Sequence, residues 1–193
     1  MMIPRLVVAS KNPDKITEIE EVLGDTGLAG EIVSGLDWPD VDETGETLEE
    51  NALLKARAVM EVTGVPAVAD DTGLEVAALR GLPGVKTARF AGEDATYADN
   101  VRLLLEKLDG IEDRRARFRT AVALVMPDNA EIVVDGALDG IIAESARGSG
   151  GFGYDPVFEV DGVTLSEMGL AEKNRISHRA KALRSLADAL IGG

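Results

Sequence analysis

The chain has 193 residues, of which 45% are hydrophobic, and it contains no cysteine. Disulfides, thiolate catalysis and zinc sites built from cysteine are therefore excluded, and the length suits one domain, residues 1–193, with a sizeable core. The formal net charge of −15 disfavours nucleic acid as a partner, because duplex binding depends largely on Lys and Arg against phosphates. A phosphorylated ligand must then meet a local cluster of cations or a metal ion.

The N-terminal residues 1–5 lack the apolar core of a signal peptide, and no apolar run approaches the length of a membrane span. We therefore expect a cytoplasmic protein without a membrane partner. Residues 6–9 follow as an apolar run of the kind found in buried strands.

The first predicted helix begins after a short polar loop. Asn12 is a favourable N-cap, and Pro13 suits the first helical position. A strand, a polar loop and a helix N-terminus can together bind an anion, because free N–H groups and the helix dipole point at the ligand. Lys15 conflicts with that dipole, which prefers acids in the first turn. A bound phosphate would remove the conflict; the alternative is a lysine in solvent.

Residues 31–38 are predicted to form the second strand and its exit, and an acidic loop over residues 40–46 follows. Residues 47–50 form a capping box, which predicts a helix running to about Thr63. Lys55 projects from a largely apolar side of that helix. This is unusual for a lysine in solvent, although its stem could lie on the apolar surface with the ammonium in water.

Two adjacent carboxylates, Asp70 and Asp71, end the apolar run of residues 65–69. Ionised Asp is costly to bury unless it is paired or holds a cation. Carboxylates at the C-terminal end of a buried strand also lie where open α/β sheets place their ligand sites. Because Gly73 allows a turn, the alternative is a strand that runs into an ordinary acidic turn.

The middle of the chain consists of shorter predicted elements. They are a short strand at residues 74–79, a turn at 81–84, a loop at 87–92, a helix capped by Thr96, and strands at 120–126 and 131–134 joined by a hairpin turn at 128–129. Gly136 and Gly140 interrupt the last strand and predict a bulge or bend there.

Residues 148–156 combine four glycines with two aromatic residues. Glycine permits a close backbone approach to a ligand, and Phe152 on this frame has no core to join. A flat ring in that setting suits stacking on a nucleic base. The alternative is a flexible linker, although linkers seldom carry Phe and Tyr.

The last predicted elements are a strand at residues 157–160, a hairpin turn at 161–162 and a helix capped by Ser177. His178, the only histidine, begins that helix, where the dipole favours a neutral imidazole. A lone histidine is usually structural, but Lys173 and Arg179 give this one polar neighbours.

These residues supply the parts that hold a nucleoside triphosphate with Mg²⁺, which binds carboxylates and phosphate oxygens together. The parts are the acids Glu43, Asp70 and Asp71, the cations Lys15, Lys55, Lys173 and Arg179, and the ring of Phe152. The P-loop signature is absent, which excludes a Walker-type NTPase. A nucleotide-binding protein without turnover is an alternative of another class.

The chain resembles the inosine triphosphate pyrophosphatase family (the Ham1-like group) at six segments in order. They are residues 10–15, 43–47 with 50–56, 69–74, 81–85 with 88–92, 151–156, and Lys173 with 177–179. The resemblance implies an α/β fold, with a mixed twisted sheet flanked by helices and two lobes around a central nucleotide cleft. It also implies a homodimer.

The family hydrolyses non-standard purine nucleoside triphosphates (ITP, dITP and XTP) to the monophosphate and pyrophosphate, using Mg²⁺. The resemblance implies that Asp71 is the catalytic residue and general base, and that Glu43 and Asp71 hold the metal. The substrate-binding residues that it implies are Ser10, Lys11, Asn12, Pro13, Asp14, Lys15, Lys55, Thr72, Phe152, Gly153, Tyr154, Asp155, Lys173, His178 and Arg179. Phe152 would stack on the base.

Two positions depart from the family's pattern. Lys86 stands where an aromatic residue is usual, and Thr72 stands where a serine is usual, which keeps the hydroxyl. Neither is an implied metal ligand or base contact. The alternative activity is that of the Maf-like relatives of similar architecture, which act on standard or modified pyrimidine nucleotides.

Overall fold

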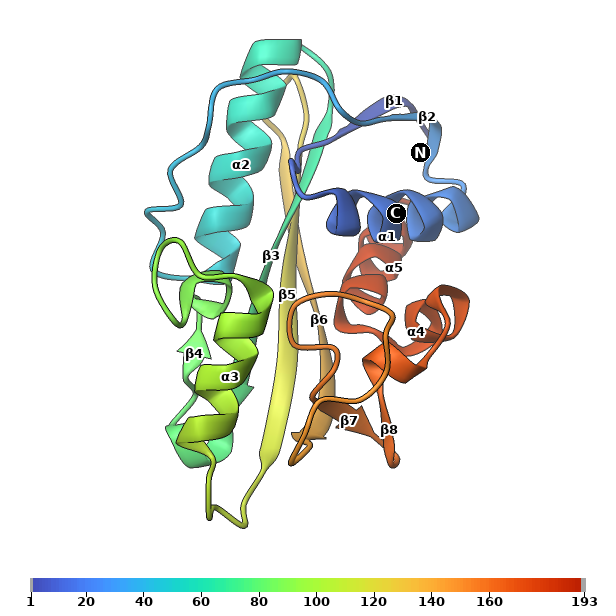
Figure 1. Cartoon of the computed structure of the whole chain (residues 1–193). Helices are drawn as coiled ribbons and strands as arrows, with labels where there is room; N and C mark the ends of the chain where they lie inside the picture. Colours follow the sequence, from blue (N-terminus) through green and yellow to red (C-terminus); the bar gives the residue numbers. More distant parts are fainter. Residues whose placement is uncertain (1, 192–193) are drawn as a thin grey trace. The chain divides into compact units, whose positions relative to one another are not determined.

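The computed structural model describes residues 2–191 (Figure 1). Its strands are β1 (Ile3–Val8), β2 (Ala29–Val33), β3 (Ala67–Val76), β4 (Pro83–Gly84), β5 (Arg115–Val125), β6 (Glu131–Ile142), β7 (Phe158–Val160) and β8 (Val163–Thr164). Its α-helices are α1 (Pro13–Thr26), α2 (Leu48–Thr63), α3 (Tyr97–Lys107), α4 (Leu170–Ile176) and α5 (His178–Ile191). Short 3₁₀-helices are η1 (Ala77–Leu79), η2 (Thr87–Arg89) and η3 (Leu165–Glu167).

Hydrogen bonds connect the strands in the order β2-β1-β3-β5-β6-β7-β8, and β4 pairs with β3. β1 runs parallel to both β2 and β3, whereas the pairs β3–β4, β6–β7 and β7–β8 are antiparallel. The predicted fold class, a mixed α/β sheet with flanking helices, is confirmed.

The described chain divides into two compact units. The first unit comprises the residues up to Asp71, Thr120–Gly136 and the residues from His178 onward; the second comprises Thr72–Arg119 and Ala137–Ser177. The chain passes from one unit to the other within β3, β5 and β6, and again between α4 and α5. That residues 1–193 act as a single domain stays a prediction.

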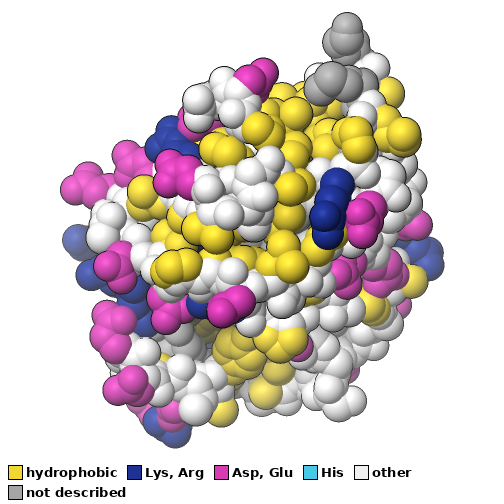
Figure 2. Space-filling view, turned by 90° about the horizontal axis from the view of Figure 1, so that it is seen from above, with side chains coloured by type: hydrophobic (Ala, Val, Ile, Leu, Met, Phe, Trp, Pro, Cys, Tyr) yellow, Lys and Arg dark blue, Asp and Glu magenta, His cyan; other side chains and the backbone are white. Residues whose placement is uncertain are grey.

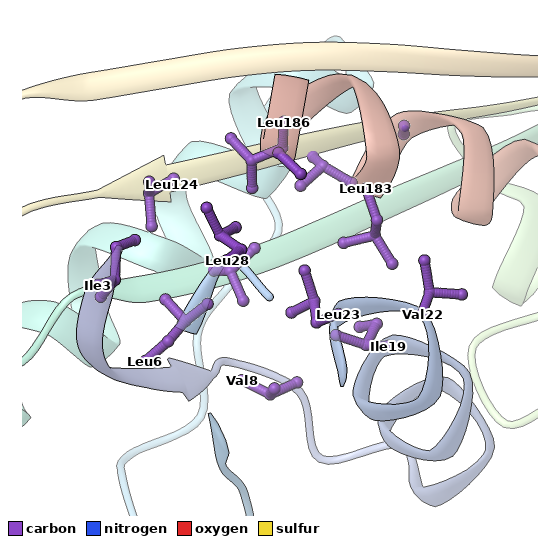
Figure 3. Packing of buried hydrophobic residues seen from close by; sticks show 14 of the residues in the cluster. Ile3, Leu6, Val8, Ile19, Val22, Leu23, Leu28, Leu124, Leu183 and Leu186 are labelled. Atoms are coloured by element: carbon purple, nitrogen blue, oxygen red, sulfur yellow. The ribbon is translucent and has the colours of Figure 1, made fainter. Parts of the chain in front are cut away.

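The core of the first unit lies between its strands and the helix pair α1 and α5 (Figures 1 and 3). Figure 3 shows Leu23 of α1 and Leu183 of α5 pointing into one cluster with Leu6 of β1 and Leu124 of β5. All four side chains are at most 1% exposed. The helix that begins at Asn12 is thus held against the strands by burial of its apolar face.

The core of the second unit is built around two phenylalanines. Phe118 of β5 and Phe158 of β7 lie with ring centroids 4.5 Å apart, and Leu104 of α3 and Leu165 of η3 belong to the same buried cluster. This core anchors α3 and the strands on either side of the glycine-rich loop at residues 148–153, so the loop begins and ends on fixed structure.

The predicted helix starts are confirmed, and α1, α2 and α3 have the capping hydrogen bonds that their sequences imply. The side chain of Asn12 accepts from the first turn of α1, and Thr47 and Thr96 form capping boxes at α2 and α3. The last helix starts at His178, directly after Ser177. Local side-chain chemistry was sufficient to place these boundaries.

The strand that carries Asp70 and Asp71 does not end at them, contrary to the prediction. β3 continues through both residues and through Gly73 to Val76, because Leu74 and Glu75 pair with the antiparallel β4. The β1–β3 pairing, however, ends at Val68. Asp70 and Asp71 therefore lie just past the carboxyl end of β1, beyond the residues that β1 pairs with.

Gly136 and Gly140 also have a different role from the predicted one, since β6 runs without interruption from Glu131 to Ile142. A Cβ at Gly136 would meet the backbone of α5, and a Cβ at Gly140 would meet Phe158 and the backbone of β7. These glycines allow close packing within each unit rather than a bend.

Candidate functional site

Asp70 is the centre of a buried ionic network in the first unit. Its Oδ2 accepts from Nε of Arg179 at 3.1 Å and lies 3.2 Å from Nζ of Lys15. Arg179 also donates to Glu18 of α1, and the side chains of Asp70, Glu18 and Arg179 are at most 4% exposed. Burial alone would raise the pKa of Asp70, but Lys15 and Arg179 outweigh it and hold that pKa well below its usual range. Asp70 is thus an ionised anchor for Lys15.

Asp71 belongs to a second, more open set of contacts. Nζ of Lys55 lies 2.9 Å from Oε1 of Glu43 and 3.4 Å from Oδ1 of Asp71, so one ammonium bridges two carboxylates. Nδ2 of Asn51 donates to Oδ2 of Asp71 at 3.3 Å. Burial raises the pKa of Asp71, and the charge of Lys55 only partly offsets it. This carboxylate would gain from a further cation.

Contacts with helix α2 hold Glu43 near Lys55 and Asp71. Asn51 and Lys55 are four residues apart and share a helix face. Oδ1 of Asn51 accepts the backbone N–H of Gly45 at 2.8 Å, which ties the acidic loop to the helix. A Cβ at Gly45 would lie 2.6 Å from that oxygen, so the contact needs a glycine there. Asn51 thereby connects the loop of Glu43 to Asp71.

The segment before α1 has hydrogen bonds and an ion pair of its own. The side chain of Asn12 already accepts the N–H groups of Asp14 and Lys15, and the hydroxyl of Ser10 accepts the N–H of Asn12. Lys11 pairs with Asp40 on the surface, at 2.6 Å. Lys15 alone of these residues reaches the buried carboxylates, while Pro13 is the exposed first residue of α1.

The pKa values of Lys15 and Lys55 shift in opposite directions. Burial would lower the pKa of Lys55, but Asp71, Asp70 and Glu43 together raise it. Burial lowers the pKa of Lys15 despite its contact with Asp70, because Lys55 and Arg179 add like charge. An anionic ligand beside Lys15 would favour its charged form.

In the second unit the glycine-rich loop holds an aromatic ring beside a buried ion pair. Lys173 of α4 pairs with Asp155, and both side chains are at most 4% exposed. Oδ2 of Asp155 also accepts the N–H of Phe152 at 2.9 Å, and Nζ of Lys173 lies 4.8 Å from the centroid of the Phe152 ring. The loop, the ion pair and the ring therefore form one connected arrangement.

The remaining predicted residues have varied surroundings. The hydroxyl of Tyr154 donates to the backbone oxygen of Thr87 at 2.9 Å, and Gly153 has a φ of 62°. Thr72 is half-buried on β3, and His178 is buried as the first residue of α5. The structure thus brings Lys15, Lys55 and the acids together within the first unit. It brings Phe152, Asp155 and Lys173 together within the second.

Two residues of the network were not among the predicted site residues. Glu18 lies one helical turn after Lys15, and Asn51 lies one turn before Lys55. A polar residue one turn from a candidate cation, on an otherwise apolar helix face, is the signal that could have indicated both.

The donor chemistry of the first unit fits a magnesium ion. Within residues 2–191 no group of three or more His, Asp or Glu side chains is arranged as a ready ligand set. Mg²⁺ is commonly held by one or two carboxylates together with waters and substrate phosphates. Glu43 and Asp71, on either side of one lysine, fit that pattern.

The fold and these contacts define an α/β protein with a cluster of carboxylates and lysines at the carboxyl end of a parallel strand. The chain belongs to the Ham1 family, whose model matches residues 6–189. The family resemblance noted from the sequence is thereby confirmed.

Individual relatives match almost the full chain. The dITP/XTP pyrophosphatase of Streptomyces coelicolor is 48% identical over 189 residues, covering 94% of each chain. That of Geobacillus kaustophilus is 48% identical and covers 97% of this chain and 96% of its own. The structure of a HAM1 protein from Coxiella burnetii has a TM-score of 0.85 at 40% identity, covering 99% of this chain and all of that one. None of the helices among residues 2–191 combines the length and apolar composition that crossing a bilayer requires.

Proposed function

We propose that this protein is a Mg²⁺-dependent pyrophosphatase that hydrolyses dITP, XTP and ITP to the monophosphate and pyrophosphate. The observation that carries the proposal is the pair of carboxylates, Glu43 and Asp71, bridged by Lys55 beside the anchored Lys15. The names of the relatives support the substrate class. They do not favour the alternative, a Maf-like activity on pyrimidine nucleotides.

The reaction is attack of water on the α-phosphorus. A bond forms between the water oxygen and this phosphorus, the bond to the α–β bridging oxygen breaks, and pyrophosphate leaves. Lys15 and Lys55 would bind the triphosphate and stabilise the negative charge that develops on it. Magnesium, held by Glu43 and Asp71, would add positive charge at the phosphate oxygens.

Asp71 would orient the attacking water and take its proton as the new bond forms. A largely dissociative transition state places little demand on the strength of the base, so a carboxylate is sufficient. Asn51, Lys55 and Gly45 keep that carboxylate in place. Asp70 would act through Lys15, by fixing its ammonium.

The base would stack on Phe152, and Asp155, Lys173, His178 and Arg179 would recognise the base and the sugar-phosphate. Donors aimed at a 6-oxo group lose their partners when adenine presents an amine, which disfavours ATP. The buried pair of Lys173 and Asp155 beside the ring supports this assignment. Arg179, by contrast, already pairs with Asp70 and Glu18. Its burial is therefore also explained by a role in positioning Asp70.

Homodimer formation and a cytoplasmic location are also part of the proposal. Several large hydrophobic side chains are exposed in the first unit, including Met2, Val62 and Val133. Figure 2 shows hydrophobic side chains gathered on one face. Apolar surface of this kind is typical of an interface between copies. Light scattering of the purified chain would give twice the mass of 20.4 kDa for a dimer.

The test of the activity is a panel of nucleoside triphosphates ranked by kcat/KM, with and without EDTA. We expect dITP, XTP and ITP to rank above ATP, CTP and UTP by at least about 100-fold. EDTA should abolish turnover, and added Mg²⁺ should restore it. A preference for a pyrimidine nucleotide, or full activity in EDTA, would contradict the proposal.

A further inference from the structure

Tyr97 contacts the ring of Phe152 in the second unit. The two ring centroids are 6.0 Å apart, and the ring planes are tilted by 43°. Such a tilted arrangement is a favourable geometry for an aromatic pair. Both rings also line one pocket of about 640 Å³, and other residues of the 148–153 loop and one side of α3 line it as well.

Phe152 needs support of this kind because its own backbone offers little. Gly151 and Gly153 on either side have positive φ angles of 68° and 62°. The hydrogen bond from the N–H of Phe152 to Asp155 fixes the backbone of the loop, but not the torsions of the ring. A ring that must present one face to a ligand gains affinity when its rotamer is fixed before binding.

Tyr97, in contrast, stands on a rigid element. It is the first residue of α3, and the capping box of Thr96 and Asp99 holds that helix end: Thr96 Oγ1 accepts the N–H of Asp99 at 3.2 Å, and the Asp99 carboxylate accepts the N–H of Thr96 at 3.0 Å. The side chain of Tyr97 is nevertheless 44% exposed. An exposed tyrosine at a capped helix start, against the one aromatic ring of a glycine loop, is well placed to support that ring.

We propose that Tyr97 is a positioning residue for substrate binding, which holds the Phe152 ring in the orientation that stacks on the purine base. The inference rests on the proposed function, because it takes Phe152 as the base platform. The two rings touch each other and are not parallel, so a base does not fit between them. Tyr97 therefore acts through Phe152 and not by direct stacking.

The experiment compares Tyr97→Ala, Tyr97→Phe and Phe152→Ala, the double variant Tyr97→Ala/Phe152→Ala, and Ile111→Ala as the matched control. Ile111 is 40% exposed in the same unit and does not line the pocket. Each variant is assayed for kcat and KM with dITP. Its affinity for dIMP is measured by calorimetry, which does not depend on turnover. Thermal unfolding verifies that each variant is folded.

Tyr97→Ala should raise KM for dITP and weaken dIMP binding by about 2-fold to 10-fold, with kcat unchanged. Tyr97→Phe should bind like the unmodified chain, because the ring is kept, and Ile111→Ala should do the same. In the Phe152→Ala background, removal of the Tyr97 ring should have no further effect.

Three results would overturn the inference. One is a folded Tyr97→Ala variant with unchanged dIMP affinity, and another is failure of Tyr97→Phe to restore it. The third is an equal loss from Tyr97→Ala when Phe152 is already absent, which would make the two residues independent. Failure of the proposed function has a different signature, namely no release of pyrophosphate from dITP by the unmodified chain whatever the dIMP affinities are.

Discussion

The two units hold their functional residues by different means. In the first unit, ion pairs hold charged side chains directly, as Arg179 and Lys15 do for Asp70. In the second unit, Phe152 stands on a loop of glycines, and its contacts include a hydrogen bond to Asp155, the ammonium of Lys173 and the ring of Tyr97. The first arrangement is costly to disturb because its charges are buried, whereas the ring of the second depends on weaker contacts.

This difference matches the chemistry proposed for each unit. Charge stabilisation at a phosphorus atom requires groups whose positions are set before the reaction, because reorganisation would cost part of the gain. A flat base needs a surface that matches its shape, and a less well held ring weakens binding without displacing the groups that act at phosphorus. Substitutions in the first unit should therefore affect kcat or stability, and those in the second unit should affect KM.

The largest expected effect is that of Asp71→Asn, which removes the water-orienting carboxylate and one metal ligand. We expect kcat with dITP to fall by about 100-fold to 10,000-fold, the range for loss of a general base. Steady-state kinetics at saturating Mg²⁺ measures it. A residual kcat within threefold of the unmodified chain would mean that Asp71 has no such role.

Asp70→Asn should mainly reduce stability, because it leaves buried cations without their shared carboxylate. We expect a loss of about 3–5 kcal/mol in the free energy of unfolding, measured by urea titration. The pKa of Asp70 in the folded chain lies below that of an Asp in the unfolded chain. The stability that Asp70 contributes is therefore fully present when the pH is above the unfolded pKa, and it is lost as the pH falls through the folded pKa.

The matched control for Asp70 is Asp40→Asn, which breaks the exposed pair with Lys11. Its urea midpoint should match that of the unmodified chain, because exposed ion pairs contribute little. Equal midpoints for Asp70→Asn and Asp40→Asn would refute the view that the first unit depends on its buried charges.

Asn51→Ala should lower kcat by about 10-fold to 100-fold, the usual loss when a residue that orients a metal ligand is removed. It would free Asp71 on one side and detach the loop of Glu43 at Gly45. The Mg²⁺ concentration needed for half-maximal activity should rise as well. An unchanged Mg²⁺ requirement would show that the loop stays in place without Asn51.

Gly151→Ala should raise KM for dITP by about 10-fold with a smaller change in kcat, because the added Cβ would meet the carboxylate of Asp155. Gly153→Ala is the matched control. It has nearly the same positive φ, but its Cβ would meet no atom within 4 Å. If both variants behave alike, backbone strain alone governs the loop and the contact with Asp155 is unimportant.

Sequence reasoning succeeded where the determinants are local. The caps Asn12, Thr47 and Thr96 were readable because a helix start is set by a few neighbouring side chains. The continuation of β3 past Asp71 could not be predicted from neighbouring residues, because it depends on pairing with β4.

Partners that are distant along the chain were also beyond prediction. Arg179 and Glu18 are 161 residues apart, and Tyr97 and Phe152 come from separate elements. The cluster of Lys15, Lys55 and the two aspartates could be predicted in composition, because buried charges need partners. The pairing of each cation with a particular acid depends on the fold, so it could not be predicted from the sequence.

The most direct test of the central claim is hydrolysis of dITP in water enriched in ¹⁸O, with the products resolved by ³¹P NMR and mass spectrometry. Attack at the α-phosphorus predicts one ¹⁸O atom in dIMP and unlabelled pyrophosphate. Label in the pyrophosphate, or orthophosphate as the first product, would contradict the account.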